Sequence, residues 1–236
     1  MSRTTPLHIG IVGCSAEGAA LCYRTICTEA PAVLGTHAHP EVSMHTPSLA
    51  RYVEALDRGD REAVAALMLD SANKLAAIGA ELLICPDNTI HQAFDLVAPC
   101  SPRPWLHIAQ VVAAEAKARG FRKIGVLGTH WLVRSDVYPQ ALQQAGLEAV
   151  RPENEDRDRL GRIIMDELVP GRVLPLSVQA MQHMIQRLAR RGCDAVVLGC
   201  TELPLALNDD NSPLPTLDST RLLARAALSR SVSRQA

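Results

Sequence analysis

The side chains best suited to chemistry begin with the stretch LLICPDNTIH at positions 82–91, where an apolar run ends on Cys85-Pro86 and Asp87 follows. Either Cys85 or Asp87 could be the reactive group, as an acid–base catalyst or a nucleophile. A second reactive thiol, Cys200, follows another apolar run at 195–199, AVVLG. The choice between Cys85 and Asp87 therefore depends on which of them the fold directs out of its strand.

Four short runs that are apolar throughout, at residues 8–12, 81–85, 123–127 and 194–198, predict buried parallel strands. Segments with apolar residues three, four and seven apart lie between them, over 64–78 and 178–188, and predict helices. Alternating strands and helices are typical of an α/β fold. The expected helix ends carry glycines where a left-handed cap is needed, at positions 79, 120, 146 and 192.

An internal repeat organises these elements. Residues 9–13 (IGIVG) match residues 124–128 (IGVLG), and residues 78–87 lie over residues 191–200 with the glycine and the acidic residue in step. We therefore expect two pseudo-symmetric α/β lobes with parallel-stranded sheets, over residues 1–105 and 106–214. Residues 215–236 are expected to form a C-terminal helix that packs back on the first lobe.

The repeat also separates Asp87 from Cys85. Ligands of open α/β sheets bind beyond the carboxyl ends of the strands, so we expect the active site in the cleft between the lobes. In the repeat register Asp87 lies over Cys200, whereas Cys85 lies over Leu198 inside a strand. This predicts that Cys85 is a core residue and that Asp87 faces the site. The alternative for Asp87 is a helix cap or Asx turn after Pro86.

Composition limits the class of partner. Lys plus Arg number 24 against 25 Asp plus Glu, and aromatic residues make up 3% of the chain, so neither nucleic acid nor an acidic membrane surface is favoured. The start of the chain has no signal-peptide pattern, which predicts a cytoplasmic protein. The seven cysteines are scattered and form no CxxC motif, so neither a disulfide framework nor a zinc ribbon is expected. His37, His39 and His45 are interpreted as loop histidines, and no metal site is expected.

Several stretches together resemble the cofactor-independent aspartate/glutamate racemase superfamily, and most closely its aspartate racemase branch. They are residues 87–91 (DNTIH), 124–129, 152–156, 163–168 and 199–202 (GCTE). The family motif is usually Cys-Asn-Thr-x-His, so Asp87 stands where the first cysteine is expected. The glycine-rich first loop is altered, and Leu174 occupies a position where some aspartate racemases carry a lysine. The resemblance implies an amino acid or related small carboxylic acid as substrate, no cofactor and a homodimer.

Racemisation beside a carboxylate needs one group that removes a proton from one face and another that delivers a proton to the opposite face. We expect Asp87 and Cys200 to be these catalytic groups, because they are repeat-related strand-end residues in the two family motifs. At neutral pH a carboxylate is ordinarily ionised and a thiol protonated, so base and acid would be assigned before the substrate binds. Cys200 is also expected just before a helix whose amides would stabilise its thiolate. The alternatives are a decarboxylase or isomerase of the same superfamily, or a non-enzymatic binder of small acids.

The remaining site residues are assigned by the same resemblance and by their positions after strands. Hydroxyl, amide and guanidinium groups are predicted to bind the substrate, and they belong to Ser15, Arg51, Asn88, Thr89, Thr129 and Thr201. For Asn88, Thr89, Thr129 and Thr201 the alternative is a turn or cap role. His91 either orients a catalytic carboxylate or lies on the following helix, and Glu202 either tunes Cys200 or caps a helix.

Overall fold

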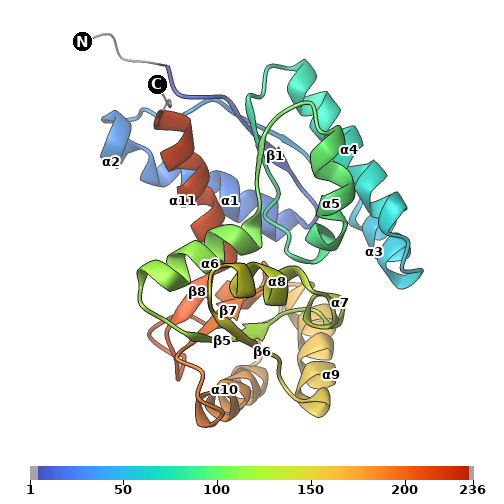
Figure 1. Cartoon of the computed structure of the whole chain (residues 1–236), viewed down its shortest axis with the longest axis vertical. Coiled ribbons are helices and arrows are strands. Elements are labelled where there is room, and N and C mark those ends of the chain that lie inside the picture. The colour runs from blue at the N-terminus through green and yellow to red at the C-terminus, as the bar shows by residue number, and fades with distance from the viewer. Residues whose placement is uncertain (1–4, 234–236) are drawn as a thin grey trace. The chain divides into compact units, whose positions relative to one another are not determined.

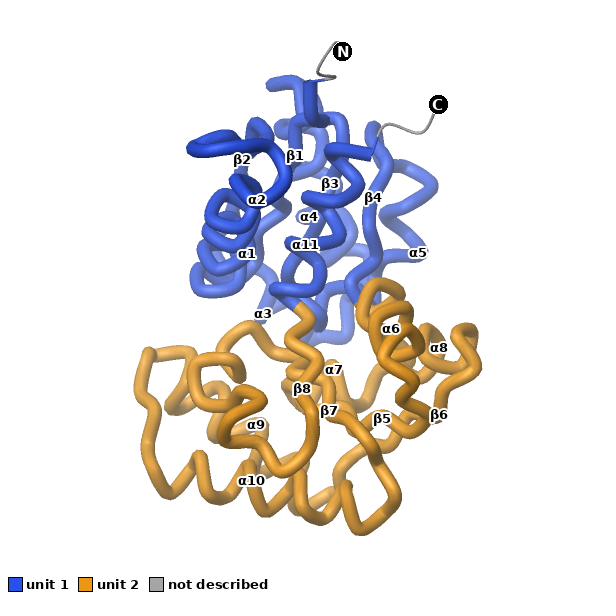
Figure 2. The backbone as a smooth tube through the Cα atoms, turned by 90° about the vertical axis from the view of Figure 1, so that its left-hand side faces the viewer, with its two compact units in different colours: residues 1–108, 220–236 blue, residues 109–219 orange. Residues whose placement is uncertain are grey.

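The computed structural model describes residues 5–233. The chain divides into two compact units, one reaching to residue 108 and resuming at residue 220, the other spanning residues 109–219 (Figure 2). Each unit contains one four-stranded sheet in which every pair of neighbouring strands is parallel. The α/β fold predicted from the alternating pattern is confirmed.

The first unit is built on a sheet with the strand order β2-β1-β3-β4. Its strands are β1 (Ile9–Val12), β2 (Val42–His45), β3 (Leu82–Ile84) and β4 (Trp105–Leu106). Its helices are α1 (Ala16–Glu29), α2 (Pro31–Leu34), α3 (Leu49–Asp57), α4 (Arg61–Ala77), η1 (Thr89–Ala93), α5 (Phe94–Val97), η2 (Ala98–Cys100) and α11 (Ser219–Val232). Helix α4 covers one face of the sheet, and α1 and α11 lie on the other (Figures 1 and 2). The central strands are therefore buried on both faces, which explains their wholly apolar sequences.

The second unit repeats this plan with the strand order β6-β5-β7-β8. Its strands are β5 (Lys123–Leu127), β6 (Glu148–Val150), β7 (Ala195–Leu198) and β8 (Thr216–Asp218). Its helices are α6 (Ile108–Ala118), α7 (His130–Arg134), α8 (Val137–Gln144), α9 (Asn154–Arg162), the π-helix η3 (Ile163–Leu168), α10 (Pro175–Arg190) and η4 (Leu203–Leu205). The sequence assigned residues 215–236 to a helix, whereas residues 216–218 form β8 and the helix begins at Ser219.

The two sheets are equivalent strand by strand, as the internal repeat predicted. Ile9 pairs with Leu82 between β1 and β3, and the repeat-related residues Ile124 and Ala195 pair between β5 and β7. The helix packing is repeated as well. A side chain at Gly10 would lie 3.2 Å from Cβ of Leu75 in α4, and one at Gly125 would lie 2.8 Å from Cδ1 of Leu188 in α10. In both units a central-strand glycine lets the covering helix approach closely.

The glycines expected at helix ends have the left-handed backbone that such caps require. Gly79, after α4, has φ 100°, and Gly192, after α10, has φ 86°. The amide of each bonds back to its helix, Gly79 to the carbonyl of Ala76 and Gly192 to that of Ala189. Each glycine turns the chain directly into the next buried strand, so the two helix–strand connections end in the same way.

Candidate functional site

In the first unit, Asp87 stands in the loop that leaves the carboxyl end of β3. It is half-buried, and its Oδ1 accepts a hydrogen bond from the backbone amide of Ile90 at 3.1 Å. The cap role considered for Asp87 therefore exists, since the side chain holds the first turn of η1. A carboxylate has several acceptor positions, so a cap bond and a catalytic role need not exclude each other.

Cys85 is a core residue, as the repeat register predicted. It is fully buried, and its thiol donates to the backbone oxygen of Asp87 at 3.8 Å. Burial, and next the nearby Asp87, raise the pKa of the Cys85 thiol well above its usual value. A thiol in such surroundings stays protonated and is a poor nucleophile. Of the two candidates in the opening stretch, Cys85 is buried in the core and Asp87 is the half-buried one that follows the strand.

His91 contacts the Asp87 loop through the main chain. Its Nδ1 lies 2.6 Å from the backbone oxygen of Asp87, and its Nε2 lies 3.3 Å from the backbone nitrogen of Ile108. This bond goes to the main-chain carbonyl of Asp87, the residue whose carboxylate His91 was expected to orient. His91 also lies within the helix η1 that follows Asp87, which was the alternative predicted for it. His91 fixes the backbone that carries Asp87.

Other predicted site residues stand at helix starts. Ser15 begins α1 and accepts from the amide of Gly18 at 3.3 Å, and Thr129 begins α7 and accepts from the amide of Leu132 at 3.2 Å. Asn88 and Thr89 are buried at the start of η1. Ser15 follows β1 and the η1 residues follow β3. Because β1 and β3 are adjacent parallel strands, the structure brings these groups to one edge of the first sheet.

Arg51 has a different setting. It is exposed on α3 and lines a groove of about 290 Å³ between α3 and α4. Glu54, Arg58 and Asp70 line the same groove, and Arg51 is one of the cations that lower the pKa of Asp70, after Lys74 and His45. Arg51 therefore faces nearby carboxylates on its own surface.

In the second unit, Cys200 follows β7 in the turn Gly199-Cys200-Thr201-Glu202. Gly199 donates its amide to the carbonyl of Leu127 at 2.8 Å, and a Cβ at position 199 would lie 2.6 Å from that same oxygen. The glycine is required because β5 and the turn approach so closely. Since β5 and β7 are neighbours, Thr129 and the Cys200 turn share one edge of the second sheet.

Glu202 is the centre of a small buried hydrogen-bond network. Its Oε2 accepts from the thiol of Cys200 at 2.9 Å and from the hydroxyl of Thr201 at 2.7 Å. Cys200, Thr201 and Glu202 are all buried, and Glu202 makes no side-chain cap bond to η4. Of the two roles considered for Glu202, contact with Cys200 is the one observed. In this arrangement the thiol of Cys200 is the donor and the Glu202 carboxylate the acceptor.

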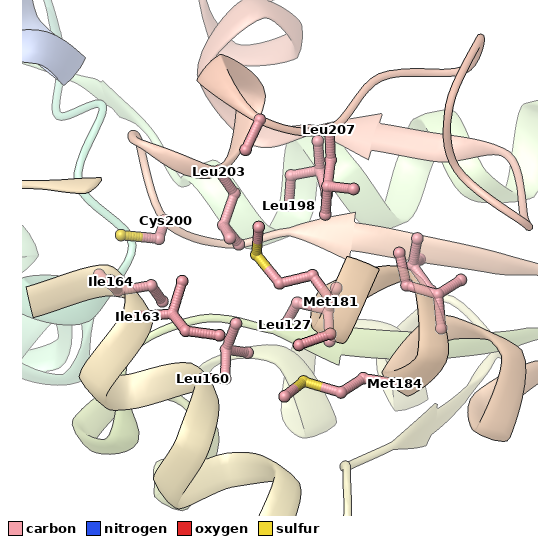
Figure 3. Close-up of a cluster of buried hydrophobic side chains, with 14 of the residues drawn as sticks. Leu127, Leu160, Ile163, Ile164, Met181, Met184, Leu198, Cys200, Leu203 and Leu207 are labelled. Atoms are coloured by element: carbon pink, nitrogen blue, oxygen red, sulfur yellow. The ribbon is translucent and has the colours of Figure 1, made fainter. Parts of the chain in front are cut away.

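The helix expected after Cys200 differs from the prediction. It is a 3-10 turn of three residues, Leu203–Leu205, and so short a helix has little dipole to stabilise a thiolate. The thiol instead contacts the Glu202 carboxylate. The apolar side of Cys200 packs in the core of the second unit, with Leu203 and with Ile163 and Ile164 of η3 (Figure 3). π-helices are rare and concentrate at functional sites, and no pattern in residues 163–168 predicted this one.

Neither a metal-binding cluster nor a membrane-spanning helix is found within residues 5–233. No group of three or more His, Cys, Asp or Glu side chains is arranged to hold a metal ion there. Nor does that part of the chain contain a helix with the length and apolar character of a membrane span. What each unit does place after its strands is a set of polar side chains, Ser15, Asn88 and Thr89 in the first unit and Thr129 and Thr201 in the second.

Comparison with known proteins gives a consistent result. The model of a family described as Asp/Glu/Hydantoin racemase matches residues 9–227. The broad specificity amino-acid racemase RacX of Bacillus subtilis is 25% identical over 173 residues, covering 72% of this chain and 73% of that protein. Among solved structures, a candidate Asp/Glu racemase from Yersinia pestis has a TM-score of 0.88 at 29% identity, covering 96% of this chain and 100% of the other. An aspartate racemase homologue from Pyrococcus horikoshii has a TM-score of 0.81 at 27% identity, covering 96% and 99%.

Proposed function

This chain belongs to the Asp/Glu/Hydantoin racemase family, and from that premise we propose that it racemises or epimerises the α-carbon of an amino acid or related small carboxylic acid without a cofactor. Similarity to a broad specificity amino-acid racemase and to an aspartate racemase homologue supports this class of substrate. The two half-sites, each at the carboxyl edge of a parallel sheet, are where ligands of α/β folds bind.

The proposed catalytic pair is Asp87 and Cys200, acting on opposite faces of the α-carbon. Asp87 stands where the family motif carries a cysteine, and the internal repeat makes the two positions equivalent. The observation that carries the assignment is the hydrogen bond from the Cys200 thiol to Glu202 at 2.9 Å. It holds one member of the pair as an acid, while the other member is a carboxylate. Base and acid are then assigned before the substrate binds.

In the proposed step, the Cα–H bond breaks as its proton passes to the carboxylate of Asp87. A new Cα–H bond forms on the opposite face with the proton of the Cys200 thiol, which becomes a thiolate. The product enantiomer leaves an enzyme with a protonated Asp87 and a deprotonated Cys200. That form can accept the product in reverse, or can return to the first form by exchanging protons with water.

The substrate carboxylate is proposed to bind among neutral donors at the strand ends. Asn88 and Thr89 follow β3, and Thr129 and Thr201 follow β5 and β7. Ser15 and Arg51 are the other proposed contacts. Ser15 also caps α1, as Thr129 caps α7, and Arg51 lines a groove together with Asp70 and Glu54. Neutral donors stabilise the substrate carboxylate less than a cation would. However, a cation in the site could form a salt bridge with Asp87 instead of the substrate, and neutral donors cannot.

The test is solvent-deuterium exchange at the α-carbon. Both enantiomers of acidic and neutral amino acids are incubated in deuterated water with the full chain, and exchange and inversion are followed by NMR and chiral chromatography. We expect uptake with inversion, and a loss of at least about 100-fold in Asp87→Asn and Cys200→Ala, the range given by general acid–base catalysis. Cys100→Ser, which changes an exposed cysteine, is the control and should leave the rate unchanged. Full exchange in both site variants would refute the assignment.

A second candidate is a decarboxylase or isomerase of the same superfamily, and the carboxylate at position 87 is the feature that favours it. A site with one thiol and one carboxylate could protonate a carbanion that forms when carbon dioxide leaves. The same incubations distinguish the two, because a decarboxylase releases carbon dioxide and a racemase does not. Ligand-dependent thermal stabilisation without either reaction would instead indicate a small-acid binding protein.

We also propose that the protein works as a cytoplasmic homodimer. Symmetric dimers are the commonest soluble assemblies, and the family resemblance points the same way. The seven cysteines form no disulfide within residues 5–233, which is usual for proteins of a reducing compartment. Light scattering of the purified chain at several concentrations measures the assembly.

A further inference from the structure

The two hydrogen bonds of His91 determine which of its ring nitrogens carries the proton. A backbone amide can only donate, so Nε2, 3.3 Å from the nitrogen of Ile108, must be the unprotonated acceptor. A carbonyl can only accept, so Nδ1, 2.6 Å from the oxygen of Asp87, must carry the proton. Both contacts are satisfied together only by a neutral imidazole in the Nδ1–H tautomer.

The surroundings of the ring favour that neutral form. His91 is 3% exposed, stacks on Phe94 with ring centroids 5.5 Å apart, and meets the edge of His107 at 4.7 Å. Burial first, and then His107, lower the pKa of His91 well below its usual value, and burial lowers the pKa of His107 to about 4. The titratable groups beside the ring are His107, from the segment after β4, and Asp87, from the loop after β3.

The Asp87 loop depends on such a contact because the local helix is weak. η1 is a 3-10 helix of five residues, and α5 and η2 after it have four and three residues. Short 3-10 segments have poor hydrogen-bond geometry and hold their own backbone loosely. The backbone oxygen of Asp87 is held instead by two buried side chains, the imidazole of His91 and the thiol of Cys85.

We propose that His91 is a positioning residue, whose neutral ring ties the backbone carbonyl of Asp87 to the backbone amide of Ile108. Ile108 is the first residue of α6 and ends the first of the two segments that form the first unit, so the tie joins the Asp87 loop to the point where the chain first leaves that unit. The proposal rests on Asp87 being the base of the proposed reaction. Proton transfer requires the base to be placed closely, and a displacement of about 1 Å can cost about 100-fold in rate.

The first test needs no turnover. Nitrogen-15 NMR of the full chain, with histidines labelled, reports the tautomer and the titration of each ring. For His91 we expect the Nδ1–H tautomer and no titration between about pH 5 and 8. An Nε2–H tautomer, or protonation near the usual histidine value, would overturn the proposal whatever the activity of the protein.

The second test compares two variants that each keep half of the tie. His91→Asn places an amide donor near the Nδ1 position and can still reach the Asp87 carbonyl, whereas His91→Gln places an acceptor near Nε2 and can reach only Ile108. We expect kcat for α-deuterium exchange to fall less than about 10-fold in His91→Asn and about 100-fold in His91→Gln, with KM unchanged in both.

The control is Phe94→Leu, which removes the stacking partner and leaves both imidazole bonds. It should lower the melting temperature and leave kcat near the wild-type value. Equal kcat in the Asn and Gln variants, or a kcat loss in Phe94→Leu as large as theirs, would mean that His91 is only a packing residue. If the wild-type chain exchanges no acid at all, the proposed function fails, and the NMR measurement still decides the tautomer.

Discussion

Adding a single methyl group at Gly199 should destabilise the second unit and displace Cys200. A Cβ there would lie 2.6 Å from the backbone oxygen of Leu127 and 2.8 Å from Cδ2 of Leu132. The leucine side chain can rotate away, but the oxygen belongs to the central strand β5 and accepts the amide of Gly199 itself. Overpacking of this kind costs about 1–3 kcal/mol, and contact with fixed backbone places Gly199→Ala near the upper value.

Urea denaturation followed by circular dichroism measures this cost. A thermal melt gives a second measurement. For a chain of this size, a loss of about 3 kcal/mol in unfolding free energy corresponds to a fall of roughly 6–12 °C in melting temperature. The matched control is Gly161→Ala in α9, where the nearest atom to the new Cβ is Cβ of His130 at 3.7 Å. That methyl fits, and alanine should stabilise the helix by about 0.5–1 kcal/mol. If Gly199→Ala lies within about 0.5 kcal/mol of wild type, the close approach inferred for the Cys200 turn is refuted.

Three further predictions concern single interactions. A double-mutant cycle between Cys200→Ala and Glu202→Gln should give a coupling of about 1–2 kcal/mol in unfolding free energy, because the thiol donates to a carboxylate; additivity within about 0.5 kcal/mol would contradict this. The carboxylate of Asp209 accepts hydrogen bonds from the hydroxyl and the amide of Thr216, and these lower the pKa of Asp209 from 3.8. The wild-type protein should therefore be more stable than Asp209→Asn above about pH 4. That difference should be below about 1 kcal/mol, because Asp209 is exposed, and should vanish as pH falls through the lowered pKa; acid titrations of both proteins check it. Thr220→Val removes a buried hydroxyl with no hydrogen-bond partner within residues 5–233 and should raise stability by about 1 kcal/mol in thermal melts, whereas a loss would reveal a partner.

The central strands could be predicted from sequence, and the edge strands could not. β1, β3, β5 and β7 are covered on both faces, so burial requires apolar residues throughout and leaves a plain pattern. β2 (VSMH) is half-exposed along its length, and β4 has only two residues. An edge strand is determined by the neighbour that it pairs with, and its own short sequence carries little information about that partner.

The candidate site divides in the same way. Strand ends and the repeat identify Asp87 and Cys200 as equivalent positions and Cys85 as core, and the structure agrees on Cys85. The acceptor role of Glu202 toward two neighbouring side chains depends on rotamers that no spacing rule gives. The bond from Ile108 to His91 joins residues 17 positions apart, and nothing in either residue type announces it.

The sequence by itself determined the class of fold, its internal duplication, the family and the residues that end each central strand. The fold class and the strand ends follow from burial and backbone sterics, which restrict residue type at each position. The family was indicated by the resemblance of short motifs such as residues 87–91 and 199–202. Only the tertiary structure decided what the polar atoms bind: that Asp87 caps η1, that Cys200 donates to Glu202, and that His91 holds a carbonyl. The physical reason is that a hydrogen bond depends on the placement of two groups, often far apart in sequence, and the type of either residue permits many partners.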